Sequence, residues 1–295
     1  MPHISFRGSK RGLKPQTKLA KERWEMETKF FTLDQKVEFL REQRIRANPQ
    51  VVAQFDEKFD QSWIYHDNAL EGVVLSYHEL KAAIDKKIIS DVSLIPMYEE
   101  IKNHKAAIEL VRATARQWAA EAHAAKKSGK AKKNPITLET LKMLHSALTP
   151  EEKAKGNPYR KDNPLHRLYF HEIAQPDKIT MRMKKLVEWL DEEETQHLHP
   201  VERAARAHYR FMSIYPWPKN SGKVARLLMN LMLLKDGFPP VVIHSIERQR
   251  YYDVLRTESA GLVPLVFESL ENGVETSSRF FAELEEAKRG QKRAS

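Results

Sequence analysis

Apolar residues recur at helical spacing over most of the chain, and this pattern predicts a mainly α-helical protein. The spacing is clearest in residues 97–125 and 201–214, and only 10 glycines occur among the 295 residues. In residues 227–234 the apolar side chains cover nearly the whole circumference of a helix. We therefore expect that helix to be central and buried.

Capping signals predict where several helices begin and end. Thr32 with Gln35 has the spacing of a capping box, and the Asn-Pro pair at 48–49 is expected to close that helix. Ser76 with Glu79 predicts a second capping box. A long series of such helices without a repeat of fixed period favours one domain.

Three segments interrupt the helical pattern. Residues 126–135 carry five lysines and are expected to form a solvated loop, because charge runs without interleaved aromatic residues are rarely nucleic-acid sites. Residues 160–179 mix Leu168, Tyr169 and Phe170 with turn residues, which predicts a short β-hairpin. Residues 1–16 are basic and punctuated by proline and glycine, and they predict a flexible arm. The single domain then spans 17–290, with a tail at 291–295.

Composition excludes several classes of chemistry. The chain has no cysteine, so disulfide scaffolds, thiolate zinc sites and cysteine nucleophiles are ruled out. Lysine and arginine outnumber aspartate and glutamate by 50 to 40, a net charge of +10 that suits nucleotides or polyanions. Six of these ten charges lie in residues 1–21. We therefore expect no nucleic-acid partner for the rest of the chain, whereas this basic arm leaves such a partner open.

No stretch reaches the ~18 apolar residues of a membrane span, and no apolar segment follows the charged amino terminus as in a secretory signal. The expectation is a cytoplasmic protein without a membrane partner.

The loop at residues 215–226 is the strongest candidate for chemistry. It leads into the predicted buried helix, whose first backbone N–H groups and positive dipole end favour an anion such as phosphate. The residues expected to contact that anion are Lys219, Asn220, Ser221, Gly222, Lys223 and Arg226. The plainer alternative is a solvent-exposed basic turn.

The spacing of the residues excludes a P-loop at this position and a histidine metal site nearby. A P-loop would require a glycine at Trp217 and a serine or threonine at Val224. His197, His199 and His208 do not have metal-ligand spacing, so we expect a helix cap and a core histidine and predict no metal site there.

Residues 202–243, which include YPWPKNSGKVAR, resemble the centre of Fic (Fido) domain proteins, whose signature is HPFx(D/E)GNGRxxR. YHDNALEG at 65–72 resembles the inhibitory helix motif of that family, Ser/Thr-x-x-x-Glu-Gly/Asn. NPYR at 157–160 resembles the run into its flap, and RQRYYDVL at 248–255 resembles the helix near the nucleotide base. The resemblance implies a helical bundle with one β-hairpin flap.

Fic proteins typically transfer AMP from ATP to a hydroxyl of a target protein. The resemblance implies an inhibitory helix region at 51–75, in which Glu71 pairs with Arg226. It places the flap at Leu168, Tyr169, Phe170 and His171. Tyr251 is expected to stack on the purine, and Ser259 stands where the family often has asparagine.

The catalytic positions of the family are replaced in this sequence. Tyr215 stands at the position of the catalytic histidine, and a phenol with an ordinary pKa near 10 is not a base at pH 7. Lys219 stands at the position of the Mg²⁺-binding acid, and an ammonium has no lone pair to offer, so dependence on Mg²⁺ is in doubt.

The shape of the loop is expected to survive these replacements. Asn220 replaces a glycine, and asparagine tolerates left-handed backbone better than most residues. Trp217 replaces the phenylalanine that anchors the loop in the core. Lys223 replaces an arginine and retains a weaker phosphate contact.

Three functions follow as alternatives. The first is a degenerate member of the AMPylation lineage, a pseudoenzyme that binds ATP or ADP but has lost AMP transfer. The second is an active transferase in which His208, His171 or the ionisation of the substrate replaces the missing base. The third is a non-catalytic interaction or regulatory module that pairs with a Fic relative. The sequence leaves open its activity, its target protein and homodimer formation.

Overall fold

In the computed structural model every regular element of the described residues is a helix. These residues are 18–85, 92–127, 134–153, 155–156, 158–164, 171–257 and 261–294, and they contain no β-strand. The α-helices are α1 (Lys18–Arg46), α2 (Pro49–Leu70), α3 (Tyr77–Ile84), α4 (Ile95–Lys127), α5 (Leu138–Leu148), α6 (Pro150–Lys153), α7 (Ile179–Asp191), α8 (Glu193–His197), α9 (Pro200–Ile214), α10 (Ser221–Lys235), α11 (Arg248–Arg256) and α12 (Leu262–Ala294). Short 3₁₀ helices lie at Val92–Leu94, Pro176–Lys178 and Ser245–Glu247.

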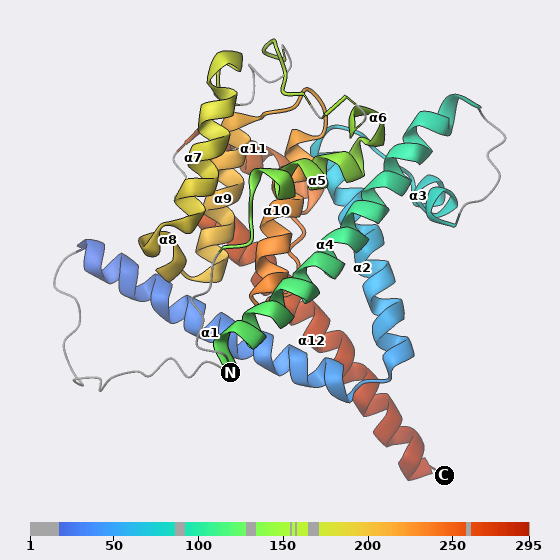
Figure 1. The fold of residues 1–295 in the computed structure, drawn as a ribbon. Helices are drawn as coiled ribbons and strands as arrows, with labels where there is room; N and C mark the ends of the chain where they lie inside the picture. The colour runs from blue at the N-terminus through green and yellow to red at the C-terminus, as the bar shows by residue number, and fades with distance from the viewer. Residues whose placement is uncertain are drawn as a thin grey trace.

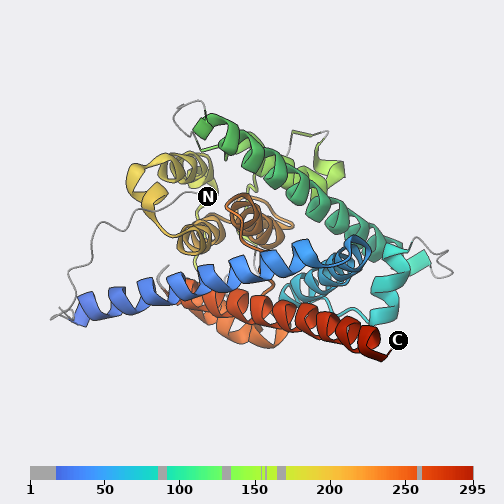
Figure 2. The same ribbon diagram turned by 90° about the horizontal axis from the view of Figure 1, so that it is seen from below.

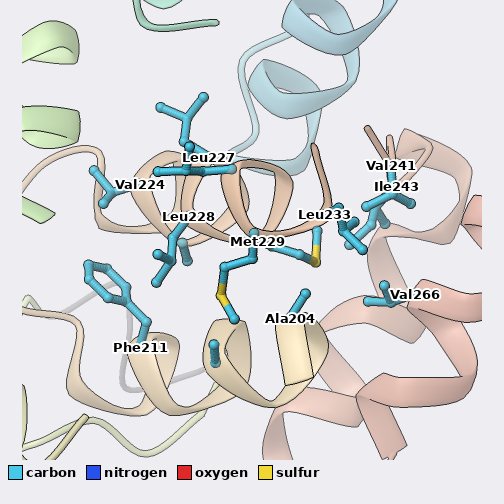
Figure 3. Close-up of a cluster of buried hydrophobic side chains, with 14 of the residues drawn as sticks. Ala204, Phe211, Val224, Leu227, Leu228, Met229, Leu233, Val241, Ile243 and Val266 are labelled. Atoms are coloured by element: carbon cyan, nitrogen blue, oxygen red, sulfur yellow. The ribbon is translucent and has the colours of Figure 1, made fainter. Parts of the chain in front are cut away.

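Helix α10 is the centre of the bundle, as its all-round apolar pattern predicts. Every residue from Ser221 to Leu233 is buried. Helices α9, α4 and α5 surround it, and α1 runs beside α12 along one side of the molecule (Figures 1 and 2). The close-up in Figure 3 shows Leu228 and Met229 of α10 facing Phe211 and Ala204 of α9. This burial fixes the start of α10, and with it the loop that precedes it.

One buried polar side chain fastens the far end of α10. Asn230 is fully buried, and its side-chain amide donates to the carbonyl of Val241 at 2.9 Å. Its side-chain oxygen accepts from the N–H of Val241 at 2.8 Å. Both hydrogen-bonding groups of the Val241 backbone are thereby satisfied inside an apolar core.

The capping box predicted at Thr32 is wrong. Residue 32 lies inside α1, and its hydroxyl donates to the carbonyl of Thr28, one turn earlier, at 3.0 Å. The buried apolar face of Phe30, Leu33 and Val37 continues past it, so packing overrides the local capping signal.

The predicted end of the first helix and the second capping box are confirmed. Helix α1 ends at Arg46, just before the Asn-Pro pair. Asn48 also caps the next helix, α2, through a hydrogen bond from the N–H of Gln50 at 2.8 Å, and Pro49 occupies the first turn. Ser76 and Glu79 form the reciprocal capping box of α3.

The predicted β-hairpin is not present in the described part of residues 160–179. The described residues there form a turn, an extended segment, the 3₁₀ helix Pro176–Lys178 and the start of α7. Leu168, Tyr169 and Phe170, on which the hairpin prediction depended, lie outside the described residues, as does the arm at 1–16. Lys126 and Lys127 belong to the last turn of α4, so the first two residues of the predicted lysine-rich loop are helical. Residues 128–133 of that prediction lie outside the described residues.

Candidate functional site

The loop between α9 and α10 has two residues in left-handed backbone. Tyr215 ends α9 with φ 49°, and its N–H donates to the carbonyl of Phe211 at 2.8 Å. Asn220 precedes α10 with φ 61°, which confirms that an asparagine accommodates the conformation expected of the glycine position. Trp217 is fully buried and stacks on His145 with ring centroids 4.3 Å apart, so it anchors the loop as predicted.

The Ser221 hydroxyl closes the loop rather than facing a ligand. It donates to the carbonyl of Trp217 at 2.8 Å and accepts from the N–H of Trp217 at 2.9 Å. Asn220 donates through its side chain to the Thr149 hydroxyl at 3.3 Å and does not cap α10. The N–H groups of the first turn are therefore not satisfied by their own N-cap side chain.

Arg160 is a structural residue of the loop that the sequence analysis missed. Its Nε donates to the carbonyl of Tyr215 at 2.7 Å, and its Nη2 donates to the carbonyl of Ala174. Its own N–H donates to the carbonyl of Pro216 at 3.0 Å. Its place in the NPYR run is the only sequence signal that pointed to it.

The last turn of α2 lies against the start of α10. Asp67 and Asn68 are buried, and Glu71 follows at the C-cap, before Gly72 at φ 89°. These residues belong to the segment that resembles an inhibitory helix.

Arg226 is the centre of a buried network. Its Nε donates to Asp67 Oδ1 at 2.7 Å, and its Nη2 donates to Glu71 Oε1 at 3.0 Å. The expected ion pair between Glu71 and Arg226 is therefore present. The Arg226 side chain is only 2% exposed, and the surrounding acids raise its pKa well above the ordinary value despite burial.

The Glu71 carboxylate occupies the position predicted for a bound anion. A Cβ placed on Gly222 would lie 2.0 Å from Glu71 Oε1, so only a glycine leaves room for this carboxylate at residue 222. Gly222 is in the first turn of α10, where the unpaired N–H groups and the positive dipole end favour negative charge. In this structure the chain supplies that charge itself.

Asp67 stands where the inhibitory motif has serine or threonine, and the sequence analysis did not predict its contacts. Its Oδ2 lies 3.2 Å from Nε2 of the fully buried His104, on α4. Burial would raise the pKa of Asp67, but the Arg226 guanidinium and the facing imidazole outweigh that effect and lower the pKa. Asp67 is thus an ionised carboxylate that joins α2 to both α4 and α10.

Lys223 is also engaged by α2. Its Nζ donates to Asn68 Oδ1 at 2.9 Å and lies 3.9 Å from the half-exposed carboxylate of Glu100. Burial lowers the pKa of Lys223. Lys219, by contrast, is exposed, so only two of the three predicted cations are buried at the start of α10.

Both histidines considered as substitute bases lie in the core. His208 Nε2 is 3.1 Å from the Tyr251 hydroxyl, and burial together with the nearby Arg226 charge lowers the pKa of His208 to about 3. His171 Nε2 is 3.0 Å from the carbonyl of Met212. His199 caps α9 as expected, by accepting from the N–H of Val201.

Tyr251 is fully buried beneath this network, and its hydroxyl lies 3.4 Å from Arg226 Nη1. Burial raises the pKa of Tyr251. Stacking of a purine on its ring stays a prediction that requires the site to open. Ser259 lies outside the described residues.

The residues do not fit a magnesium ion at the family position. The acid position carries Lys219, and the nearby carboxylates of Asp67 and Glu71 are paired with Arg226. Within the described residues no three histidine, aspartate or glutamate side chains gather as a metal-binding group. Over the same residues, no helix is long and apolar enough to cross a bilayer.

Comparison with known proteins gives a family match for part of the chain. Residues 135–233 match the model of the Fic/DOC family. The match covers α5 to α10, and helix α2, which closes over the start of α10, lies outside it.

Curated relatives of this chain include proteins named protein adenylyltransferase Fic. The protein adenylyltransferase Fic of Culex quinquefasciatus is 29% identical over 199 residues, which are 67% of this chain and 37% of that protein. The Drosophila virilis protein of the same name is 28% identical over the same share of this chain and 38% of its own length. The chain thus matches less than two fifths of these relatives.

Solved structures share the fold. A Fic domain containing signaling protein from Bacteroides thetaiotaomicron has a TM-score of 0.69 at 23% identity, over 86% of this chain and 98% of that one. Fic-1 from C. elegans has a TM-score of 0.64 at 21% identity, over 90% of this chain and 77% of that one. The helical architecture is therefore that of Fic proteins.

The buried His208 predicts a loss of stability in weak acid. Its pKa of about 3 in the folded chain lies below the ordinary value of 6.5, so the unfolded chain binds the proton first as the pH falls. This histidine alone should remove about 2 kcal/mol from the free energy of unfolding between pH 7 and pH 5. Urea denaturation at the two pH values measures the effect.

His208→Gln should flatten that pH dependence. His123→Gln is the matched control, because His123 is exposed and its replacement should leave the dependence unchanged. An equal slope in His208→Gln and the unmodified chain would contradict the assignment.

Proposed function

We infer that this chain is a Fic-domain protein of the protein adenylyltransferase lineage that has lost the usual AMP transfer and whose nucleotide site is held closed by α2. One observation carries the proposal: the two buried cations at the start of α10 are already bound by the last turn of α2. Arg226 is paired with Asp67 and Glu71, and Lys223 is hydrogen-bonded to Asn68.

Loss of transfer is supported by the burial of two side chains considered for the role of general base, Tyr215 and His208. The histidine position carries Tyr215, whose side chain and backbone are 2% exposed. A general base must reach the proton that it removes and must have a pKa near the working pH. His208 fails on both grounds, since it is fully buried and its pKa is about 3.

Binding of phosphate is supported by what Glu71 does in this structure. A carboxylate at the start of α10 shows that the position accepts negative charge, and a nucleotide phosphate would replace that carboxylate after α2 withdraws. A guanidinium offers a two-pronged donor that suits phosphate as well as carboxylate. The ligand class is therefore ATP or ADP, in competition with the α2 acids.

A non-catalytic interaction module is the second candidate. It is supported by the filling of the site with the chain's own side chains, because Asp67, Arg226 and Tyr251 are all buried. In that case the buried network around Arg226 only stabilises the fold, and the molecule binds a protein partner through its surface. Nucleotide binding separates the two candidates.

The first prediction concerns opening of the site. Asp67→Ser with Glu71→Gly frees both acid contacts of Arg226, and we expect ATP to bind at least about tenfold more tightly than to the unmodified chain, equivalent to ~1.4 kcal/mol. Glu71→Gly alone should increase the affinity for ATP more than the affinity for ADP. The increase should be smaller than in the double variant, because Asp67 still pairs with the Arg226 guanidinium. Calorimetry without divalent metal, at low and high salt, measures both affinities, which should fall with salt.

The control removes two exposed acids elsewhere, Glu193→Gln with Glu286→Gln, and so matches the change in net charge. If this control gains as much affinity as the open variant, the effect is general attraction and not release of Arg226. If the open variant binds neither ATP nor ADP at millimolar concentration, the interaction module is favoured and nucleotide binding is excluded.

The second prediction concerns AMP transfer. With labelled ATP and Mg²⁺, neither the unmodified chain nor Tyr215→His should label itself or lysate proteins, because Lys219 still opposes a metal ion at the acid position. In the open variant, Tyr215→His with Lys219→Asp is the combination expected to regain labelling. Robust AMP transfer by the unmodified chain would overturn the proposed loss of activity.

A further inference from the structure

A cavity of about 230 Å³ lies away from the motif loop. It is lined by residues of α1, the first half of α2, α4, α12 and the end of α10 with the segment that follows it. Its α10 residue, Leu234, is 13 residues beyond the start of that helix, which places it about 20 Å from the loop at 1.5 Å per residue. It is therefore a separate site.

The walls of the cavity are mostly apolar and aromatic. The apolar side chains are Val37, Leu40, Phe55, Phe59, Leu234 and Phe238. A cavity of about 150 Å³ with such walls holds one benzene ring. The larger volume here has room for one aromatic ring and a small polar group.

Three arginines supply the polar part of the lining. They are Arg41, Arg44 and Arg112, and the one acid of the lining is Asp56. Arg41 is more than half exposed and pairs with Glu38 at the surface, so it contributes charge at the rim. The lining carries more positive than negative charge.

Arg44 is fixed by contacts that use only some of its N–H donors. Its Nη2 donates to both carboxylate oxygens of Asp56, at 2.9 and 2.8 Å. Its guanidinium also lies over the rings of Phe55 and Phe281, 5.8 and 5.7 Å from their centroids. Within the described residues, Nε and Nη1 of Arg44 make no hydrogen bond, so part of the five-donor fork remains uncommitted.

Arg112 contributes a second, mostly buried guanidinium to the lining. Its Nη2 donates to Asp60, and its side chain is 18% exposed. A charged acceptor such as a carboxylate forms a stronger hydrogen bond with a guanidinium than a neutral acceptor does.

We propose that this cavity binds a small carboxylate ligand whose apolar body is about the size of one aromatic ring. The carboxylate faces Arg112 and Arg44, and the ring packs against Phe55, Phe59 and Phe238. This site is independent of the nucleotide site proposed above.

Benzoate is the probe, titrated by calorimetry and by ligand-observed NMR. We expect a dissociation constant on the order of 1 mM, as suits a ligand of nine heavy atoms. Benzyl alcohol, which keeps the ring without the charge, and acetate, which keeps the charge without the ring, should each bind at least about tenfold more weakly. Equal binding of benzoate and benzyl alcohol would overturn the role of the arginines.

Two variants locate the site. Val37→Phe fills the cavity without changing any charge and should abolish benzoate binding, whereas unchanged binding would place benzoate elsewhere on this basic protein. Arg112→Gln with Asp60→Asn removes the buried pair together, so no carboxylate is left unpaired, and should weaken benzoate at least about tenfold. Unchanged affinity for benzoate in this double variant would also overturn the proposal. Circular dichroism verifies that Val37→Phe and the double variant are both folded.

Discussion

The ion pair between Arg226 and Asp67 is the contact on which the arrangement of the site depends. Both side chains are 2% exposed, and removal of one partner from such a pair leaves an uncompensated charge in the core, at a cost of about 3–5 kcal/mol. Because Asp67 belongs to α2, Arg226 to α10 and the facing His104 to α4, this pair also fixes three helices relative to one another. The candidate nucleotide site is closed as a consequence of packing.

Net charge is a poor guide to this site. The chain carries +10 overall, yet the two cations at the start of α10 are matched by Asp67, Glu71 and Asn68 within the protein. Lys219 is exposed to solvent. A phosphate must therefore compete with internal carboxylates, and this competition gives Glu71 its proposed inhibitory role.

Local signals predicted local features well. Helical periodicity gave the central α10, the Ser76–Glu79 box gave the start of α3, and the family resemblance gave the Glu71–Arg226 pair. The contacts of Asp67 with Arg226 and of Lys223 with Asn68 join residues more than 150 positions apart, and no periodicity encodes them. The Thr32 error has the opposite cause: a correct local signal was overridden by the packing of α1.

A double-mutant cycle on Asp67 and Arg226 tests the central claim most directly. The free energy of unfolding is measured by urea denaturation for the unmodified chain, Asp67→Ala, Arg226→Met and the double variant, without nucleotide. Either single change should cost about 3–5 kcal/mol and the double change little more, so the coupling energy should be close to the cost of one single change, about 3–4 kcal/mol. Additive single effects, within about 0.5 kcal/mol, would show that the two residues do not hold the site together.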